Sequence, residues 1–588
     1  MHTDPVDPTT RRRAIAAALG TEPFDLLLTG GTVVDVGCGE LRLADVGIVG
    51  PIIASVHEAG SRTDALDALD CTGRFVAPGF LDLHVHFESS MLTPGSYTQA
   101  VLPRGTTTVF ADPHELANVA GVAGVRYAVE ASRGLPMRFV IQAPSCVPPQ
   151  PGLELSGADL FRPDIEEMLS WDEVGGQAEV MDMLGVLGAD DRMVGVVDAG
   201  LESGKLVSGH AAGLTGAALQ GYLSAGMTSD HEVFTEPDCL EKLRAGMTVE
   251  LRGAVDAILP GIVAEVNSLP MVPTHLVAAT DDLFALTLLE EGGIDHLLRR
   301  VIRYGMDPIV ALRCATYHAA YRLQRADLGL VAAGRRADIV VLGDLRDVRV
   351  EDVLFDGRHV ASRGELLVDV TEGPCDPPLD TMKVSGVTAD DMVIRLDVPD
   401  GVHRVRTIAD AVMTRWDEID VAVTDGVVAV PPGHVVQVSI HRHGRVPATP
   451  YAALLAGWGD WTGAVATTVS HDTHNLVVFG RDADDMALAA NTVIATGGGV
   501  AVASGGDVVA SVALPIAGIL SPLPAKELAT FQRAVQDAAV RIGLVAPTLT
   551  QPLFQVMLSS LACIPGPHVT DVGLIDGTTG ELVASMLV

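Results

Sequence analysis

Residues 78–90 read PGFLDLHVHFESS, and this stretch decides the fold. An apolar run leads directly into His84 and His86, which lie two residues apart. Side chains at positions i and i+2 of a β-strand point to the same face of the sheet, so the spacing predicts two neighbouring imidazoles at the end of a strand. Such a pair is typical of a metal site, but two ordinary strand histidines would have the same spacing.

Seven further strand-like runs follow before residue 283, and helix-like stretches separate them. They are TTTVFAD (106–112), MRFVIQAP (137–144), GQAEVMD (176–182), KLVSGHA (205–211), MTSDHE (227–232), MTVELRG (247–253) and HLVAATDD (275–282). Apolar strands that alternate with helices in this way indicate a parallel sheet. Eight such runs predict an α/β fold, a TIM-like (β/α)8 barrel over residues 76–325, with its active site at the carboxyl ends of the strands.

Segments whose sequence is typical of β-strands flank the predicted barrel on both sides. The sequence of residues 1–75 predicts a short helix over residues 11–19 followed by strands, and the sequence of residues 326–372 again predicts strands. These two segments together predict a small split β-sandwich domain. The PCDPP run at 374–378 predicts a linker, and residues 380–588 mix strands with helices as an additional C-terminal α+β domain.

Composition excludes several classes of partner. The 588 residues include 39 basic and 75 acidic side chains, a net charge of −36. That charge opposes binding to nucleic acid and to anionic membranes, and no uncharged stretch has the character of a spanning helix. Seven scattered cysteines without a CxxC pair support neither a disulfide scaffold nor a cysteine zinc site. We therefore expect a cytoplasmic protein with no nucleic-acid or membrane partner.

Polar residues close three of the later strand-like runs. His210 ends KLVSGH, His231 ends MTSDH, and Asp281 lies near the end of HLVAATDD. Each of these residues alone has the ordinary interpretation of a solvated turn residue. Together with the two strand histidines, however, they would place four imidazoles and a carboxylate at one rim of the barrel. That set can hold a divalent metal and leave a position open for water.

The order of these residues, with PGFLDLHVH before them and GRRAD (334–338) after them, resembles the amidohydrolase superfamily. Within it, PGFLDLHVHFESSMLTP, GTTTVFADPHELANV, LSAGMTSDHE and VSHDTHNLVVFG resemble the bacterial adenine deaminases, and these blocks spread over most of the chain. The resemblance implies hydrolytic deamination of adenine to hypoxanthine and ammonia. It also implies two divalent metal ions, Mn or Fe in first place with Zn compatible, and a homodimer.

The resemblance further implies a ligand set. The HxH pair, His84 and His86, would bind one metal, and His210 and His231 would bind the second. No lysine closes the fourth predicted strand, and Glu179 in GQAEVMD matches the glutamate that this family uses as the bridge. A carboxylate there would also supply the negative charge that two cations beside four imidazoles require.

Proton transfer requires further residues. Asp281 would bind one metal and accept a proton from the attacking water. Glu115 and His114 in the ADPHE segment are the candidates that protonate the purine ring, and Asp112 would contact the purine edge. An Asp-Pro turn with a helix cap is the alternative interpretation of this segment.

Residues near these motifs are candidates for substrate contacts. Glu88 and Ser89 follow the HVH stretch and would line the pocket, although a helix N-cap is an equal alternative for Ser89. Arg252 ends the seventh run and would anchor the substrate or a carboxylate.

The VSHDTHN segment contains the strongest polar group outside the barrel. His471 and His474 would contact the substrate by completing the active site, while a further metal site and an orienting loop are alternatives. The HRHG segment at 441–444 is similar, but we expect it to be a solvated turn.

Other functions stay open from the sequence alone. Hydrolysis of a cyclic amide, as in dihydropyrimidinase-like relatives, is opposed by the missing lysine on the fourth strand. Departures from the family pattern, such as Ala212 and His318, leave a substituted adenine or another cyclic amidine as a substrate. A non-catalytic scaffold is opposed by the complete set of candidate ligands.

Overall fold

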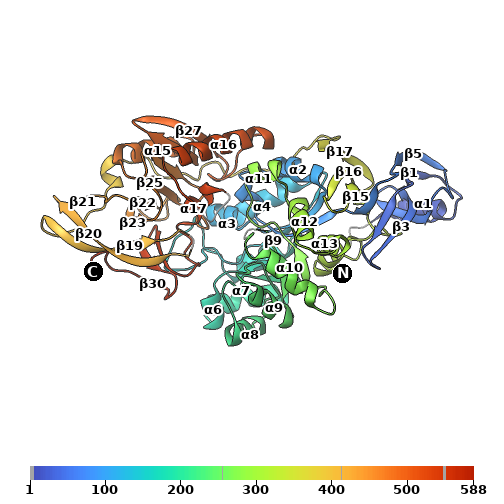
Figure 1. Cartoon of the computed structure of the whole chain (residues 1–588), viewed down its shortest axis with the longest axis horizontal. Helices are drawn as coiled ribbons and strands as arrows, with labels where there is room; N and C mark the ends of the chain where they lie inside the picture. Colours follow the sequence, from blue (N-terminus) through green and yellow to red (C-terminus); the bar gives the residue numbers. More distant parts are fainter. Residues whose placement is uncertain (1–5, 254–255, 412, 547–550) are drawn as a thin grey trace.

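The computed structural model describes residues 6–253, 256–411, 413–546 and 551–588. Figure 1 shows three parts along the long axis of the molecule. The N-terminal strands lie at one end, the C-terminal sheet lies at the other, and a parallel α/β region lies between them (Figure 1).

The central region is built from eight parallel strands, and each of the eight predicted runs contains one of them. One parallel sheet contains β7 (Phe80–Val85), β8 (Thr106–Ala111), β9 (Arg138–Ala143), β10 (Val174–Val180) and β11 (Leu206–Gly209). A second contains β12 (Ser229–Asp230), β13 (Thr248–Leu251) and β14 (Leu276–Ala278). The prediction of a mixed α/β fold with a curled parallel sheet is confirmed.

Backbone contacts join the two sheets. The amide of Thr228 donates to the carbonyl of Val207 at 3.2 Å, which brings β12 beside β11. At the other edge Val85 pairs with Asp281 in a parallel bridge, and the amide of Asp281 donates to the carbonyl of His84 at 2.9 Å. The end of the first strand therefore lies beside the residues that follow the last strand.

Helices connect successive strands of this region. They are α2 (Pro94–Val101), α3 (His114–Ala120), α4 (Val122–Ser132), α5 (Arg162–Leu169), α6 (Met183–Leu187), α7 (Asp191–Glu202), α8 (Gly216–Ser224), α9 (Glu236–Arg244) and α10 (Leu259–Ser268), followed by α11 (Ala285–Glu290), α12 (Ile294–Arg303), α13 (Pro308–Cys314) and α14 (Tyr317–Arg322). Helix α9 illustrates why such segments are helical. Its N-cap Thr235 accepts a hydrogen bond from the Asp238 amide, proline stands in its first turn, and basic residues occupy its last turn.

The N-terminal sheet combines strands from both sides of the central region. After α1 (Pro8–Ala18), its strands are β1 (Phe24–Thr29), β2 (Thr32–Asp35), β3 (Glu40–Val49), β4 (Ile52–Glu58), β5 (Ala65–Asp70), β6 (Phe75–Pro78), β15 (Ile339–Asp344), β16 (Arg349–Phe355), β17 (Arg358–Ser362) and β18 (Glu365–Leu366). Strand β15 pairs antiparallel with β6. Gly79 lies between β6 and β7, and a Cβ atom there would lie 2.3 Å from the Thr107 side chain, so this step between sheets requires glycine.

The C-terminal region is built around a nine-stranded sheet. Its strands are β19 (Gly401–Ala409), β20 (Arg415–Thr424), β21 (Val427–Val428), β22 (His434–Ile440), β23 (Tyr451–Ala456), β24 (Ala464–Thr467), β25 (Leu476–Gly480), β26 (Gly499–Ser504) and β27 (Asp507–Ala513). Helices α15 (Ala483–Ala495), α16 (Ala525–Arg541) and α17 (Pro552–Leu558) and the small sheet β28 (Pro567–Thr570), β29 (Gly573–Asp576) and β30 (Glu581–Leu582) complete it.

Helix α16 ties this region to the parallel strands. The side chain of Gln532 donates to the carbonyl of Ser90 at 2.9 Å and accepts from the amide of Leu286 at 2.9 Å. The amide of Ser521 donates to the carbonyl of Met91, also at 2.9 Å. The residues that follow the HVH stretch are therefore fixed by the C-terminal region.

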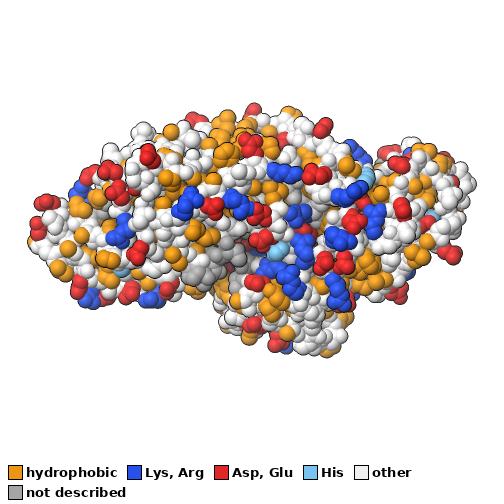
Figure 2. Space-filling view, turned by 45° about the horizontal axis from the view of Figure 1, so that its top comes forward, with side chains coloured by type: hydrophobic (Ala, Val, Ile, Leu, Met, Phe, Trp, Pro, Cys, Tyr) orange, Lys and Arg blue, Asp and Glu red, His pale blue; other side chains and the backbone are white. Residues whose placement is uncertain are grey.

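The surface mixes charges of both signs. Figure 2 shows basic and acidic side chains interspersed on one face, with apolar side chains among them. Within the described ranges, no helix combines the length and the apolar character that a membrane crossing requires.

Candidate metal centre and active site

Six ligand-type side chains meet at the carboxyl ends of the parallel strands. We call this group the metal-ligand cluster. Its members are His84, His86, Glu179, His210, His231 and Asp281. All of them are buried. The structure thus brings together every residue that the sequence proposed as a metal ligand, because the carboxyl ends of parallel strands share one rim.

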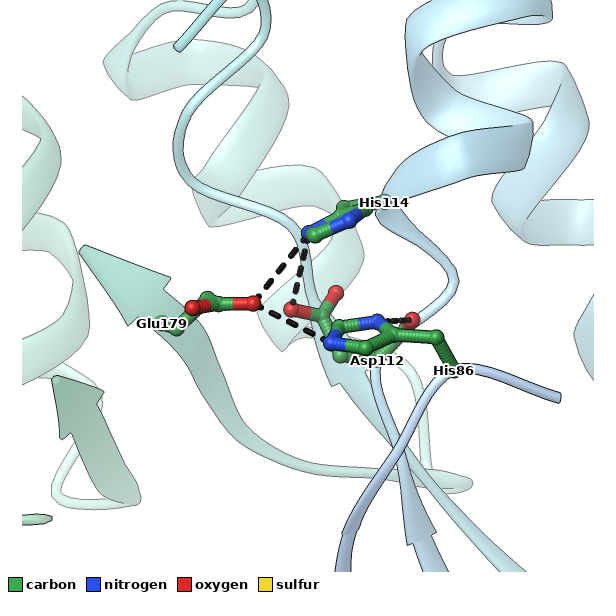
Figure 3. Close-up of side chains that lie close together, drawn as sticks. All are labelled: His86, Asp112, His114 and Glu179. Atoms are coloured by element: carbon green, nitrogen blue, oxygen red, sulfur yellow. Dashed lines mark hydrogen bonds and ion pairs between the residues drawn. The ribbon is translucent and has the colours of Figure 1, made fainter. Parts of the chain in front are cut away.

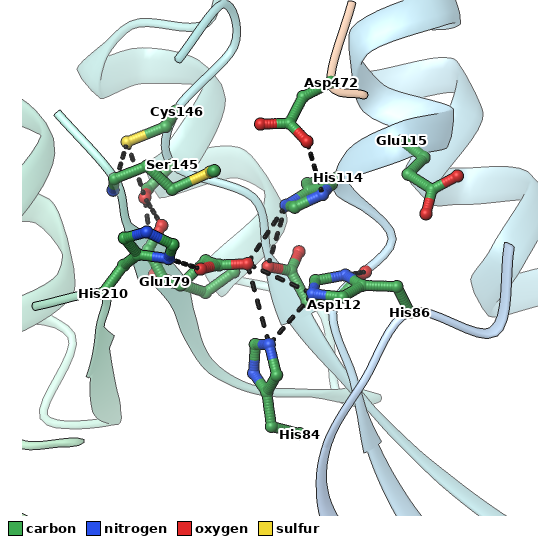
Figure 4. A network of polar contacts seen from close by, with 12 residues as sticks. His84, His86, Asp112, His114, Glu115, Ser145, Cys146, Glu179, His210 and Asp472 are labelled. Atoms are coloured by element: carbon green, nitrogen blue, oxygen red, sulfur yellow. Dashed lines mark hydrogen bonds and ion pairs between the residues drawn. The ribbon is translucent and has the colours of Figure 1, made fainter. Parts of the chain in front are cut away.

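Glu179 lies at the centre of the metal-ligand cluster, and its two oxygen atoms face different imidazoles. Oε1 lies 3.2 Å from His86 Nε2 and 3.7 Å from His84 Nε2. Oε2 lies 2.6 Å from His210 Nδ1 and 3.3 Å from His231 Nε2. Figure 4 shows His84, His86 and His210 around this carboxylate. Burial disfavours its charge, but His231 and His210 hold the pKa of Glu179 well below its ordinary range.

Asp281 closes the metal-ligand cluster on the side of the last strand. Its Oδ1 lies 3.5 Å from His84 Nε2 and 3.4 Å from His86 Nε2. The guanidinium of Arg252 pairs with its other oxygen and also with Glu232 at 2.7 Å. Arg252 therefore contacts two carboxylates.

The donor atoms suit a divalent metal. Glu179, His210 and His231 each offer one ligand atom within 4.8 Å of the others, and so do His84, His231 and Asp281. The Nδ1 atoms of His84 and His231 are buried and have no hydrogen-bond partner among the described residues. Imidazole nitrogen and carboxylate oxygen are ligands that Mn, Fe and Zn all accept, so the residues present fit such an ion.

The ADPHE segment lies directly beside the metal-ligand cluster. His114 begins α3, and its Nδ1 lies 3.4 Å from Asp112 Oδ2 and 3.5 Å from Glu179 Oε1, as Figure 3 shows. Its Nε2 lies 3.7 Å from Asp472 of the C-terminal region (Figure 4). Burial and His86 lower the pKa of His114, but Asp112 and Asp472 raise it to about 10 overall. The carboxylates of Asp112 and Asp472 thus favour the protonated form of this imidazole.

Glu115 follows His114 in the chain and lies outside the metal-ligand cluster. The Ser89 hydroxyl contacts Glu115 Oε1 and also lies 2.5 Å from Asp282 Oδ1. Burial raises the pKa of Glu115. Ser89 lies inside the short 3-10 helix η1 (Phe87–Ser90), so its side chain joins two carboxylates and does not act as an N-cap.

Glu88 is the other candidate from this stretch. Its Oε1 accepts from the Leu116 amide at 3.4 Å, while its Oε2 is buried without a hydrogen-bond partner. Burial and the neighbouring Glu115 raise the pKa of Glu88 well above its ordinary range.

Asp282 is a site residue that the sequence reasoning did not select. Asp281 has a positive φ of 60°, so the chain leaves the extended conformation there and both adjacent carboxylates reach the site. Asp282, Glu115 and His471 also offer ligand atoms within 4.8 Å of one another. The TDD sequence was the available signal, but strand periodicity assigns the two residues to opposite faces.

The VSHDTHN segment reaches this site from the loop between β24 and β25. His474 Nε2 lies 3.3 Å from Glu115 Oε2, and Asp472 faces His114. Burial and His471 lower the pKa of His474 well below its ordinary value. The C-terminal region therefore contributes side chains to the same site as the parallel strands, among them Asp472 of the VSHDTHN segment that the sequence singled out.

The expectation of a solvated HRHG turn is wrong for its first two residues. His441 and Arg442 are buried, and only Gly444 of the segment is fully exposed. His441 Nδ1 pairs with Asp571 at 2.8 Å. The Arg442 guanidinium donates to the carbonyls of His474 and Ala517, which explains why this charged side chain can be buried.

Comparisons with known proteins show the family of the chain. The model of the amidohydrolase family matches residues 75–360, and that of the adenine deaminase C-terminal domain matches residues 411–581. An adenine deaminase of Klebsiella pneumoniae (strain 342) is 52% identical over 98% of this chain and 96% of its own length. One of Serratia proteamaculans is 50% identical over 98% and 97%.

Among solved structures, an adenosine deaminase from Xanthomonas campestris with bound zinc superposes with a TM-score of 0.45 and 15% identity, over 59% of this chain and 95% of that one. The full-length relatives decide the family. The chain belongs to the adenine deaminase family, within the amidohydrolases.

Proposed function

We propose that the chain catalyses the hydrolytic deamination of adenine to hypoxanthine and ammonia at a buried centre of two divalent metal ions. The observation that carries this proposal is Glu179, whose two oxygens face the two pairs of histidines. The similarity to relatives named adenine deaminase over nearly the whole chain supports adenine as the substrate.

Two ions would divide the metal-ligand cluster between them. His84, His86 and Asp281 would hold one ion, His210 and His231 the other, and Glu179 would lie between them. Mn or Fe is our first choice and Zn is compatible, since imidazole and carboxylate ligands accept all three. A bound divalent ion lowers the pKa of water towards neutrality and so supplies hydroxide as the nucleophile.

The protein side chains would move the protons. Asp281 accepts the proton that water loses as the oxygen attacks C6, since its Oδ1 faces the metal-ligand cluster. Ring N1 gains a proton at the same step, and Glu115 or His114 supplies it. Burial raises the pKa of Glu115, and the carboxylates around His114 raise the pKa of that imidazole, so both shifts favour the protonated form. The Asp281 carboxylic acid then gives its proton to the amino group, the C6–N bond breaks to release ammonia, and the O6 hydroxyl returns a proton to the residue that protonated N1, which leaves hypoxanthine.

Substrate contacts would come from both regions of the chain. Among the described residues, Asp112 Oδ1 and His471 Nε2 are buried without a hydrogen-bond or ion-pair partner, and His474 Nε2 faces Glu115 nearby. Buried polar atoms of this kind are available for the edge of a purine. We assign Glu88 and Ser89 to the same wall. Arg252 would act through Asp281, whose carboxylate it holds.

An assay for turnover tests this proposal directly. Metal-free protein is supplied with Mn2+, Fe2+ or Zn2+ and then with adenine, and both the ultraviolet spectrum and the released ammonia are followed. We expect equimolar hypoxanthine and ammonia. A metal-loaded protein that leaves adenine unchanged would refute the proposal.

The alternative substrates give different products in the same assay. A cyclic-amide hydrolase would open dihydropyrimidines without releasing ammonia, and Glu179 stands near the end of β10, where such relatives carry a lysine. A deaminase of substituted adenines would convert N6-substituted purines faster than adenine.

The division of the chain is part of the proposal. We infer a split β-sandwich from residues 1–75 and 326–372, a (β/α)8 barrel over residues 76–325 and a C-terminal α+β domain over residues 380–588. The pairing of β15 with β6 and the meeting of β7 with the residues after β14 support this division. The homodimer and the cytoplasmic location remain predictions.

A further inference from the structure

A fully buried lysine lies behind one half of the metal-ligand cluster. Lys242 on α9 is 0% exposed and is one of only four lysines in the chain. Its ammonium group lies 2.8 Å from Asp230 Oδ2 and 2.9 Å from Asp238 Oδ1, and it donates to the carbonyl of Glu232 at 2.7 Å. These three oxygens match the three donors of an ammonium group.

Two of these contacts flank a single cluster member. Asp230 precedes His231 in the chain and Glu232 follows it. Lys242 therefore contacts the side chain of the residue before that histidine and the backbone carbonyl of the residue after it. Asp230 and Lys242 are both fully buried, so water does not screen this ion pair.

Asp230 extends the network to the neighbouring strand. Its Oδ1 accepts a hydrogen bond from the amide of Ala211 at 2.6 Å, and Ala211 directly follows His210. One carboxylate thus connects the residue after His210 with the residue before His231. These are the two imidazoles that face Glu179 Oε2.

From this geometry we infer that Lys242, acting through Asp230, is a positioning residue that sets the affinity of the metal ion held by His210 and His231. This inference rests on the two-ion centre of the proposed function. Groups that orient metal ligands typically change metal affinity 10–100-fold when they are removed. Among the described residues, the polar contacts of Lys242 and Asp230 do not include His84 or His86, and His84 meets this network through its stacking on His231. The other ion should therefore change its affinity far less.

The test is a titration of metal-free protein with Mn2+, with free Mn2+ followed by electron paramagnetic resonance. For Lys242→Met we expect one of the two dissociation constants to rise about 10–100-fold, with the other changed less than about twofold. In His210→Asn the same ion should be lost, and the remaining constant should match the one that Lys242→Met leaves unchanged.

A second lysine gives a matched control. Lys205 donates to the carbonyls of Leu169, Trp171 and Val174, and it lies at the opposite end of β11 from His210. Lys205→Met removes a similar set of contacts without touching Asp230. We expect both of its Mn2+ constants to equal those of the wild type.

The inference fails if Lys242→Met changes neither constant, if both rise equally, or if the wild type binds a single Mn2+. Because Lys242→Met leaves the Asp230 carboxylate buried alone, Asp230→Asn/Lys242→Met provides a variant without that charge, and it should weaken the same ion at least about threefold. Circular dichroism of the metal-free proteins monitors folding. These titrations need no adenine, so they fail separately from the deaminase assay.

Discussion

Replacement of Asp281 by asparagine tests the centre of the proposed chemistry. Asparagine has the same shape, and its carbonyl oxygen can still face His84 and His86, but its amide accepts no proton at neutral pH. Removal of a general base typically lowers the rate about 10²–10⁴-fold, equivalent to about 3–5 kcal/mol in the activation free energy. We expect kcat to fall within this range.

The structure indicates that Asp281→Asn should have little effect on the fold. Arg252 loses one carboxylate partner but keeps Glu232 at 2.7 Å, and its side chain is 20% exposed. The Arg252 guanidinium therefore keeps a carboxylate partner and is not left as a lone buried charge. The melting temperature and the bound metal should stay close to those of the wild type.

The assay combines kcat for adenine, from absorbance and ammonia release, with elemental analysis of the same protein sample. Asp282→Asn is the matched control, because it removes the adjacent carboxylate, which faces Ser89 at 2.5 Å. Its loss in kcat should be at least about tenfold smaller. A fully metal-loaded Asp281→Asn protein that keeps more than about a tenth of the wild-type kcat would refute the role of Asp281 as the base.

Three other variants address the surroundings of the site. Ser89→Ala removes the hydroxyl between two carboxylates, and we expect kcat to fall about tenfold with unchanged metal content; unchanged kcat would exclude a role for this hydroxyl. Arg442→Met leaves the carbonyl of His474 without its donor, at a cost of about 1–3 kcal/mol, so the melting temperature should fall in calorimetry, and an equal value would contradict this. For Asp352, burial raises the pKa but the hydrogen bond from His359 and other partners lower it to about 2 overall. Because the folded pKa lies below the unfolded one, this stabilisation, at most about 2 kcal/mol, is complete above about pH 4 and is lost towards pH 2. The difference in melting temperature between wild type and Asp352→Asn should therefore shrink as the pH falls through this range. A constant difference would contradict the lowered pKa of Asp352.

The parallel strands could be predicted because their pattern is local. Each strand is a short apolar run, and each candidate ligand closes one of these runs, as His84 and His210 do. Parallel strands bring such ends to one rim whatever the details of the helices between them. Glu179 is different, since its carboxylate at a strand end has an equally ordinary solvated interpretation, and only the family resemblance selected it.

The remaining site residues depend on contacts that no local pattern reports. Asp472 meets His114 although 358 positions separate them in the chain. Asp282 reaches the site because φ is positive at Asp281, and periodicity assumes a regular strand. Arg442 appears polar and solvated in the sequence, but carbonyls from distant segments surround its guanidinium. Burial of a polar group depends on such partners and not on the residue type.

The balance of buried charge explains why the metal centre and the C-terminal loop belong to one site. Several buried or largely buried carboxylates lie in or beside the metal-ligand cluster, among them Asp112, Glu115, Glu179, Asp281, Asp282 and Asp472. Burial of carboxylates without partners is unfavourable, and the permanently cationic side chain in direct contact with them among the described residues is Arg252. Two divalent ions would supply four positive charges beside Glu179 and Asp281. The imidazoles of His114 and His471 would then pair with the carboxylates outside the metal-ligand cluster. His471 belongs to the C-terminal region. On this account the C-terminal loop would stabilise Glu115 and His114, the candidate proton donors, while the metal ions would stabilise the attacking water.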